Sequence, residues 1–157
     1  MDEFAPPDES VRHEARGTLT TWLEGLTENP VVAAVVEDEE TDLDRWFVRV
    51  HGEAKDVYSV WFELRQRTLR VESYVMPGPE ENHAVFFEQL LRRNANLRDI
   101  GFCIGAENAI YLLGRLDLRT LDTETLDRCL GEIYETIEAS FQPAIQLGFA
   151  SRFAKDS

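Results

Sequence analysis

Residues 84–142, AVFFEQLLRRNANLRDIGFCIGAENAIYLLGRLDLRTLDTETLDRCLGEIYETIEASFQ, decide the fold. Apolar side chains at helical spacing predict one helix that ends near Asn94 and another that Asp122 caps and that Pro143 ends or kinks. Between the two helices, the turn at residues 105–108 predicts a pair of short strands. The apolar residues that carry this pattern are Phe86, Phe87, Leu90, Leu91, Phe102, Ile104, Ile110, Leu112, Leu116, Leu126, Leu130, Ile133, Ile137 and Phe141.

Upstream of this stretch, residues 45–51, 56–64 and 69–76 alternate between apolar and polar positions and are joined by short turns. Alternation with period two predicts an antiparallel sheet with one buried and one partly wet face. We expect the buried face to carry Trp46, Val48, Val50, Tyr58, Val60, Phe62, Leu64, Leu69, Val71 and Val75. The wet face would carry Arg45, Phe47, Arg49, His51, Val57, Ser59, Trp61, Glu63, Arg70, Glu72, Tyr74 and Met76.

The N-terminal third predicts a loose acidic tail over residues 1–9 and an amphipathic helix over residues 10–26, capped by Ser10 or by Asp8. The β-branched run 31–36 predicts a short strand, either buried on both faces or at an edge. The element order is therefore α-β-β-β-β-α-β-β-α. It predicts an α+β domain over residues 10–153, with an antiparallel sheet of five or six strands, helices at both ends and one inserted helix.

Charge is distributed unevenly along the 157 residues, which carry a net charge of -14. Residues 1–44 hold 13 acidic residues against Arg12 and Arg16, so this part carries -11. The acidity argues against a nucleic-acid partner, because such a surface needs a basic footprint. It promotes solubility, or it forms an acidic arm that attracts a basic partner or keeps wrong partners away.

The sequence also predicts a cytoplasmic protein that does not act in a membrane. Its longest apolar run, residues 31–36, is far shorter than a membrane span, and its N-terminus has no readable signal peptide. The two cysteines, Cys103 and Cys129, suggest neither a disulfide framework nor a zinc site, and we interpret both as reduced core thiols.

No motif predicts catalysis, a metal site or a cofactor site. His13, His51 and His83 lie far apart in the sequence and on different predicted elements. The nearest candidate nucleophile, Cys103, stands within a strand pattern rather than at a nucleophile elbow. Glu80 and Glu81 fit first-turn charges of the helix that Asn82 would cap, and Asn94 fits a structural role at its end. The protein is therefore not expected to be an enzyme.

Segments across nearly the whole chain resemble the YbjN domain family of bacteria, of the actinobacterial kind, whose fold resembles that of type III secretion chaperones. These segments are RTLRVESYVMPGPEEN (67–82), LLRRN (90–94), FCIG (102–105), IYLLGR (110–115), LDRCLGEIY (126–134) and GFASRF (148–153). The resemblance implies one chaperone-like domain and a sensory transduction or stress regulator, with no catalytic residues to transfer. Fold analogy alone is a weak basis for function.

The wet sheet face has the composition of an interaction surface, because aromatic side chains on it alternate with charged ones. We predict a protein-binding regulator, with a homodimer as the default way to cover the face. Three alternatives remain: a sensor of small anionic ligands at the arginines between Arg65 and Arg98, an enzyme of an undescribed type, or aromatic side chains covered by the chain's own tail, residues 145–153. The predicted binding residues are Phe47, Trp61, Tyr74 and Tyr111 as aromatic anchors, with Arg45, Arg49 and Arg70 at the rim.

Overall fold

The computed structural model describes residues 8–39 and 44–154, so most of the predicted acidic tail, residues 1–7, lies outside the described residues. The α+β class and the order of elements are as predicted, with a short terminal helix in addition. The helices are α1 (Glu9–Gly25), α2 (His83–Asn94), α3 (Thr123–Gly148) and α4 (Ala150–Ala154). The strands are β1 (Val32–Glu37), β2 (Arg45–His51), β3 (Val57–Leu64), β4 (Thr68–Met76), β5 (Ile100–Ile104) and β6 (Ile110–Asp117). Single turns of 3-10 helix follow α1, β5 and β6.

The six strands form one antiparallel sheet in the order β1-β2-β3-β4-β6-β5. The run that contains β1 is therefore an edge strand, one of the two alternatives that its sequence left open. Its residues are half-buried or exposed, because only one side of β1 has a neighbouring strand.

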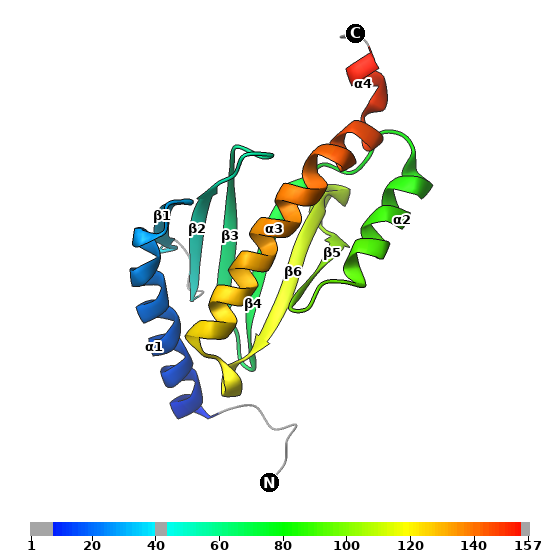
Figure 1. Cartoon of the computed structure of the whole chain (residues 1–157). Coiled ribbons are helices and arrows are strands. Elements are labelled where there is room, and N and C mark those ends of the chain that lie inside the picture. The colour runs from blue at the N-terminus through cyan, green and yellow to red at the C-terminus, as the bar shows by residue number, and fades with distance from the viewer. Residues whose placement is uncertain (1–7, 40–43, 155–157) are drawn as a thin grey trace.

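Three helices cover a single face of this sheet (Figure 1). α1 lies over β1 to β3, α3 crosses the middle and α2 lies over β5 and β6, all on the same side. We call the covered side the inner face and the opposite side the outer face. The largest fully buried side chains lie between the helices and the inner face: Leu19, Val48, Val50, Phe62, Leu69, Met76, Phe86, Ile110, Leu112, Leu126, Ile133 and Ile137.

The first helix begins earlier than the sequence pattern placed it. Asp8 is the N-cap, because its carboxylate accepts a hydrogen bond from the backbone N–H of Val11 at 3.1 Å. The Ser10 hydroxyl donates to the same carboxylate at 2.6 Å, and this bond lowers the pKa of Asp8. Glu9 is therefore part of α1 rather than of the tail, and Asp8 rather than Ser10 caps the helix.

The predicted alternation of β4 fails at its last residue, Met76. It was assigned to the wet face, yet it is 1% exposed. The pairing between β4 and β6 shifts by one residue between Tyr74 and Met76, which is a β-bulge. The bulge turns Met76 to the inner face beside Ile110 and leaves Tyr74 on the outer face.

The long helix α3 continues through Pro143 to Gly148, so of the two predicted outcomes, an end or a kink at Pro143, the first is wrong. Proline has no backbone N–H, and the carbonyl of Ala139 therefore lacks its helical donor. The Arg93 side chain, from the last turn of α2, donates to that carbonyl at 3.4 Å. A side chain of the neighbouring helix α2 thus partly replaces the hydrogen bond that the internal proline removes from α3.

The C-terminal tail packs on the helix side, beside the segment that leads into α2. Asn82 has a left-handed backbone, φ 56°, and its side chain donates to the carbonyl of Leu147 at 2.8 Å instead of capping α2. Glu80 pairs with Arg152 at 2.6 Å, and Glu81 accepts from the hydroxyl of Ser151 at 3.0 Å, so neither acts as a first-turn charge of α2. The alternative in which residues 145–153 cover the outer aromatic side chains is therefore wrong.

The free edge of β5 is closed by two side chains from the helices. Asn94 accepts from the N–H of Phe102 at 2.7 Å and donates to its carbonyl at 3.3 Å, as a neighbouring strand would. Glu132 accepts from the N–H groups of Arg98, Asp99 and Ile100 at 3.0, 2.9 and 3.3 Å. Asn94 is structural, as predicted, and acts through its side chain.

Candidate functional site

The outer face carries ordered rows of side chains because the strands pair in antiparallel register. Phe47 on β2 lies opposite Trp61 on β3, and Trp61 lies opposite Glu72 on β4. Two residues further along β4, on the same face, Tyr74 lies opposite Tyr111 on β6. No element within residues 8–39 and 44–154 lies on this side of the sheet (Figure 1), so the rows face away from the body of the domain.

Four side chains of β2 and β3 form what we call the arginine–aromatic stack: Arg49, Phe47, Trp61 and Arg45. The rings of Phe47 and Trp61 are 4.7 Å apart. The Arg45 guanidinium lies 4.4 Å from the centre of the Trp61 ring, and that of Arg49 lies 6.0 Å from the Phe47 ring. Guanidinium groups stack well on aromatic faces. Two cations therefore flank two rings and hold them in a defined arrangement.

Tyr74 and Tyr111 form a second aromatic pair on the same face. Their rings are 5.6 Å apart at 84°, an edge-to-face contact, and Tyr74 is 42% exposed. Burial and the neighbouring Tyr111 raise the pKa of Tyr74. A tyrosine hydroxyl can donate a hydrogen bond to a partner. Rings with a polar tip are suited to protein interfaces.

The carboxylates of the outer face are engaged within the chain, and most of its arginines are not. Glu63 pairs with Arg65 at 3.1 Å and Glu72 pairs with Arg70, also at 3.1 Å. Within the described ranges, Arg45, Arg49 and Arg115 make no ion pair. The Nε atoms of Arg45 and Arg70 are covered and have no hydrogen-bond acceptor in the described part of the chain. The charges of Arg45, Arg49 and Arg115 are thus not neutralised within the described ranges, and the covered Nε atoms leave the terminal amino groups of Arg45 and Arg70 as their donors to a partner.

All seven residues that the sequence analysis named lie on the outer face. That analysis did not name Leu113, Arg115 and Cys103, which β6 and β5 place on the same face. The alternation around Tyr111 could have identified Leu113 and Arg115. Cys103 lies opposite Tyr111 and is half-buried, so its assignment to the core was wrong; Cys129, on α3, is buried as predicted. Burial raises the pKa of both thiols, that of Cys129 to about 12.

An ammonium group lies at the end of the outer face, where β3 and β4 separate. Lys55 donates to the carbonyls of Tyr74 and Val75 at 3.0 and 2.7 Å. Its Nζ lies 5.0 Å from the ring of Tyr74, 5.6 Å from that of Phe141 and 5.9 Å from that of Tyr58. Burial lowers the pKa of Lys55 to about 8, although the carbonyls and rings favour the charged form.

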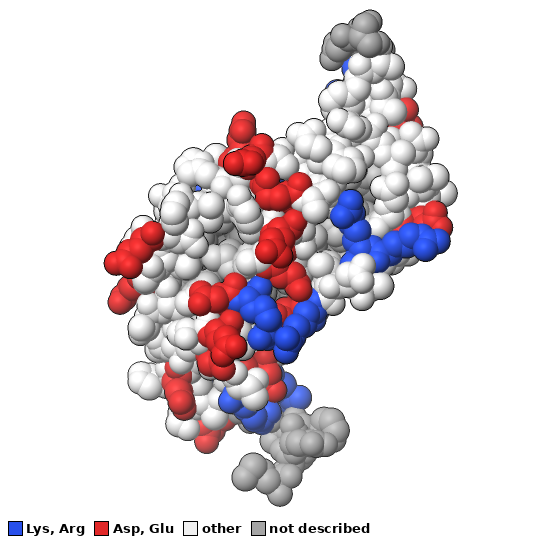
Figure 2. Space-filling view, viewed as in Figure 1, with Lys and Arg blue, Asp and Glu red and all other residues white. Residues whose placement is uncertain are grey.

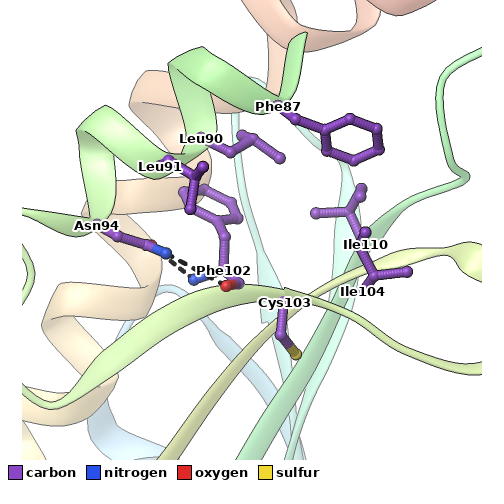
Figure 3. A pocket seen from close by; sticks show the side chains of 8 residues that line it. All are labelled: Phe87, Leu90, Leu91, Asn94, Phe102, Cys103, Ile104 and Ile110. Carbon is purple, nitrogen blue, oxygen red and sulfur yellow. Dashed lines mark hydrogen bonds between the residues drawn. The ribbon is translucent and has the colours of Figure 1, made fainter. Parts of the chain in front are cut away.

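A pocket lies on the helix side, between α2 and β5 (Figure 3). This α2–β5 pocket has a volume of about 320 Å³. Its one amide, Asn94, is already bonded to Phe102, and the Cys103 side chain points away to the other side of the strand (Figure 3). The pocket therefore offers only apolar contacts. Its lining consists of Phe87, Leu90, Leu91, Asn94, Phe102, Cys103, Ile104 and Ile110.

The arginines between Arg65 and Arg98 do not converge on one site. Arg65 lies at the β3–β4 turn next to α1, where its carbonyl accepts from Arg12 at 3.3 Å. Arg70 lies on the outer face, whereas Arg92 and Arg93 end α2 on the helix side. Arg92 pairs with Glu88 at 3.1 Å. The geometry thus gives an anion site in this region no support.

No group of three or more His, Cys, Asp or Glu side chains within residues 8–39 and 44–154 is arranged to hold a metal ion. Nor does any helix in those ranges have the length and apolar character that a membrane crossing requires.

Comparison with known proteins adds a family assignment. Residues 16–146 match the model of the YbjN family, described as "Putative bacterial sensory transduction regulator". An uncharacterized protein of Mycobacterium leprae is 32% identical over 112 residues, which cover 71% of this chain and 61% of the relative. Uncharacterized proteins of Mycobacterium bovis and Mycobacterium tuberculosis are each 30% identical over 109 residues, 69% of this chain and 60% of the relative. The chain spans about three fifths of the length of these curated relatives.

Proposed function

Because the chain belongs to the YbjN family, we propose that it is a non-enzymatic regulatory protein that binds a protein through the outer face of its sheet. The bound protein is a partner or a second copy of this chain. A regulator without catalytic activity must act through what it binds, and the outer face offers the aromatic and arginine side chains that dominate interface energies. A cytoplasmic location and a fold related to type III secretion chaperones remain predictions.

One observation carries this proposal. The outer face is left uncovered by every described element, although Phe47, Trp61, Tyr74 and Tyr111 lie on it. Tyr74 is exposed and the other three are half-buried, and a contiguous group of accessible aromatic side chains is typical of an interaction site. Helices cover the inner face of the same strands, so the outer face is the part of the sheet that a second molecule can reach.

The test compares binding by the wild type, by Trp61→Ala and by a matched control. Leu91, which is 69% exposed on α2, supplies the control as Leu91→Ala, because it lies on the helix side. We expect Trp61→Ala to lose proteins that the immobilised wild-type chain retains from a bacterial lysate, or to weaken self-association in sedimentation. Leu91→Ala should change neither.

The opposite pattern would contradict the proposal. Binding or self-association that depends on Leu91 and not on Trp61 would move the interface to the α2–β5 pocket. The proposal would also lose its support if the wild-type chain is monomeric at tens of micromolar and Trp61→Ala retains every protein that the wild type retains. No interface on the outer face would then be supported.

A further inference from the structure

The outer face differs in charge from the rest of the chain. Its strands place four arginines there, against three carboxylates, and the face therefore carries a formal charge of +1. The whole chain carries -14. Figure 2 views the helix side, where carboxylate side chains are spread over the region of α1 and α3. The charged residues of the outer face are Arg45, Arg49, Arg70 and Arg115, with Glu63, Glu72 and Asp117.

The three carboxylates already have partners within the chain. Glu63 and Glu72 are in ion pairs, and Asp117 accepts from the N–H of Arg119 at 2.9 Å. Three of the four arginines have no carboxylate partner among residues 8–39 and 44–154, as described above. The bond from a backbone N–H leaves the charge of Asp117 in place, so in the described ranges three unpaired arginines face one carboxylate without an ion pair, and the unmatched charge on the outer face is positive.

Two of these arginines are also held in place before any partner arrives. The half-buried Arg45 lies 4.4 Å from the Trp61 ring and the exposed Arg49 lies 6.0 Å from the Phe47 ring, so part of the side-chain entropy that binding would cost has already been lost. The Nε of Arg45 is covered, which leaves its terminal amino groups to donate hydrogen bonds to a carboxylate. A pre-arranged guanidinium binds a carboxylate through two parallel hydrogen bonds.

We propose that the outer face binds an acidic segment of a different protein, whose carboxylates meet Arg45, Arg49 and Arg115 and whose apolar side chains contact the aromatic residues between them. This inference rests on the proposed function and specifies the chemistry of the partner.

Two other occupants fit the same face less well. A second copy would bring the same unpaired arginines against one another, which opposes association. Single-stranded nucleic acid would stack its bases on exposed rings, but guanidinium groups already lie over Phe47 and Trp61.

The experiment measures fluorescence anisotropy of a labelled random copolymer of glutamate and tyrosine with the full-length chain. Arg45→Gln/Arg49→Gln removes two cations from the stack. Arg92→Gln/Arg98→Gln removes two exposed cations on the helix side and gives the same net charge. Circular dichroism of all proteins establishes that they are folded. Labelled oligothymidylate and sedimentation of the chain alone serve as the tests for the other occupants.

We expect the copolymer to bind the wild type and to bind Arg45→Gln/Arg49→Gln roughly 10-fold more weakly, with a change below about 2-fold in the control. Binding should weaken as salt rises from about 50 to about 200 mM. Arg45→Lys/Arg49→Lys, which keeps the charge but not the planar stacking, should recover only part of the affinity.

Several results would overturn the inference. These are equal losses in the two double variants, no copolymer binding by the wild type at low salt, tighter Arg45-dependent binding of oligothymidylate, or self-association that requires Arg45 and Arg49. If the copolymer fails while Trp61→Ala still abolishes binding in the test of the proposed function, only the acidic chemistry of the partner is wrong. If both tests fail, the outer face is not an interface.

Discussion

The two faces of the sheet are made by the same strands, yet their side chains have different surroundings. Phe62 and Trp61 are consecutive residues of β3. Phe62 is 0% exposed and contacts the ring of Trp22 on α1 edge-to-face at 5.4 Å. Trp61 is half-buried and contacts Phe47 and Arg45 from its own sheet. The difference shows that the inner face supplies the stability of the fold, while the outer face can take part in binding without loss of the core.

The largest effect should come from truncation of the inner face. Phe62→Ala removes a fully buried ring and leaves a cavity between β3 and α1, so we expect the free energy of unfolding to fall by about 3–5 kcal/mol. Urea denaturation followed by circular dichroism measures this change. A loss as small as that of Trp61→Ala would contradict the distinction between the two faces.

The Lys55 ammonium, at the end of the sheet, predicts a pH dependence. Burial lowers its pKa to about 8 in the folded state, from 10.5 as the ordinary value. Between these pH values the unfolded chain binds the proton and the folded chain does not, so stability should rise with pH through this window. Because Lys55 is partly exposed, we expect a gain of about 1–2 kcal/mol rather than the full shift.

The measurement is the difference in unfolding free energy between the wild type and Lys55→Met at several pH values between about 7 and 10.5. The comparison with Lys55→Met is needed because Cys129 acts in the opposite direction over part of the same pH range. Its pKa is raised to about 12 in the folded chain, so the unfolded chain releases the thiol proton first and the free energy of unfolding falls as the pH rises. A difference that does not change with pH would show that the carbonyls of Tyr74 and Val75 hold the ammonium charged.

The smallest change in stability should come from the outer face. Trp61→Ala removes the contacts with Phe47 and Arg45 but leaves no buried cavity, so we expect a loss of about 1 kcal/mol. The same denaturation experiment checks it, with Phe62→Ala as the reference. A loss above about 3 kcal/mol would mean that Trp61 belongs to the core and that its effect on binding is indirect.

Alternation along β2 to β4 was enough to predict which residues face each side, because side-chain direction in a strand depends only on position. It failed at Met76, where a β-bulge adds one residue, and a bulge leaves no reliable mark in a single sequence. The local sequence around Pro143 was misleading for a similar reason: the carbonyl of Ala139, which loses its helical donor, accepts a hydrogen bond from Arg93 of α2, 50 positions before Pro143 in the sequence.

The candidate site was predicted in composition but not in detail. The order in which β4 pairs with β6 brings Tyr74 to Tyr111 and adds Arg115 to the face, and this order is not readable from local pattern. The stacking of Arg45 and Arg49 on rings from β2 and β3 likewise depends on the register between strands. Sequence reasoning therefore found the residues, and only the structure found which arginines have no carboxylate partner within the described ranges.

Hydroxyl-radical footprinting of the isolated full-length chain, read by mass spectrometry over a dilution series, tests the central claim that the outer face is open in a single chain. The account predicts that Trp61, Tyr74 and Tyr111 are oxidised several-fold faster than Trp22 and Trp46 in dilute protein. Equal protection of Trp61 and of the buried Trp22 and Trp46 at every dilution would contradict it.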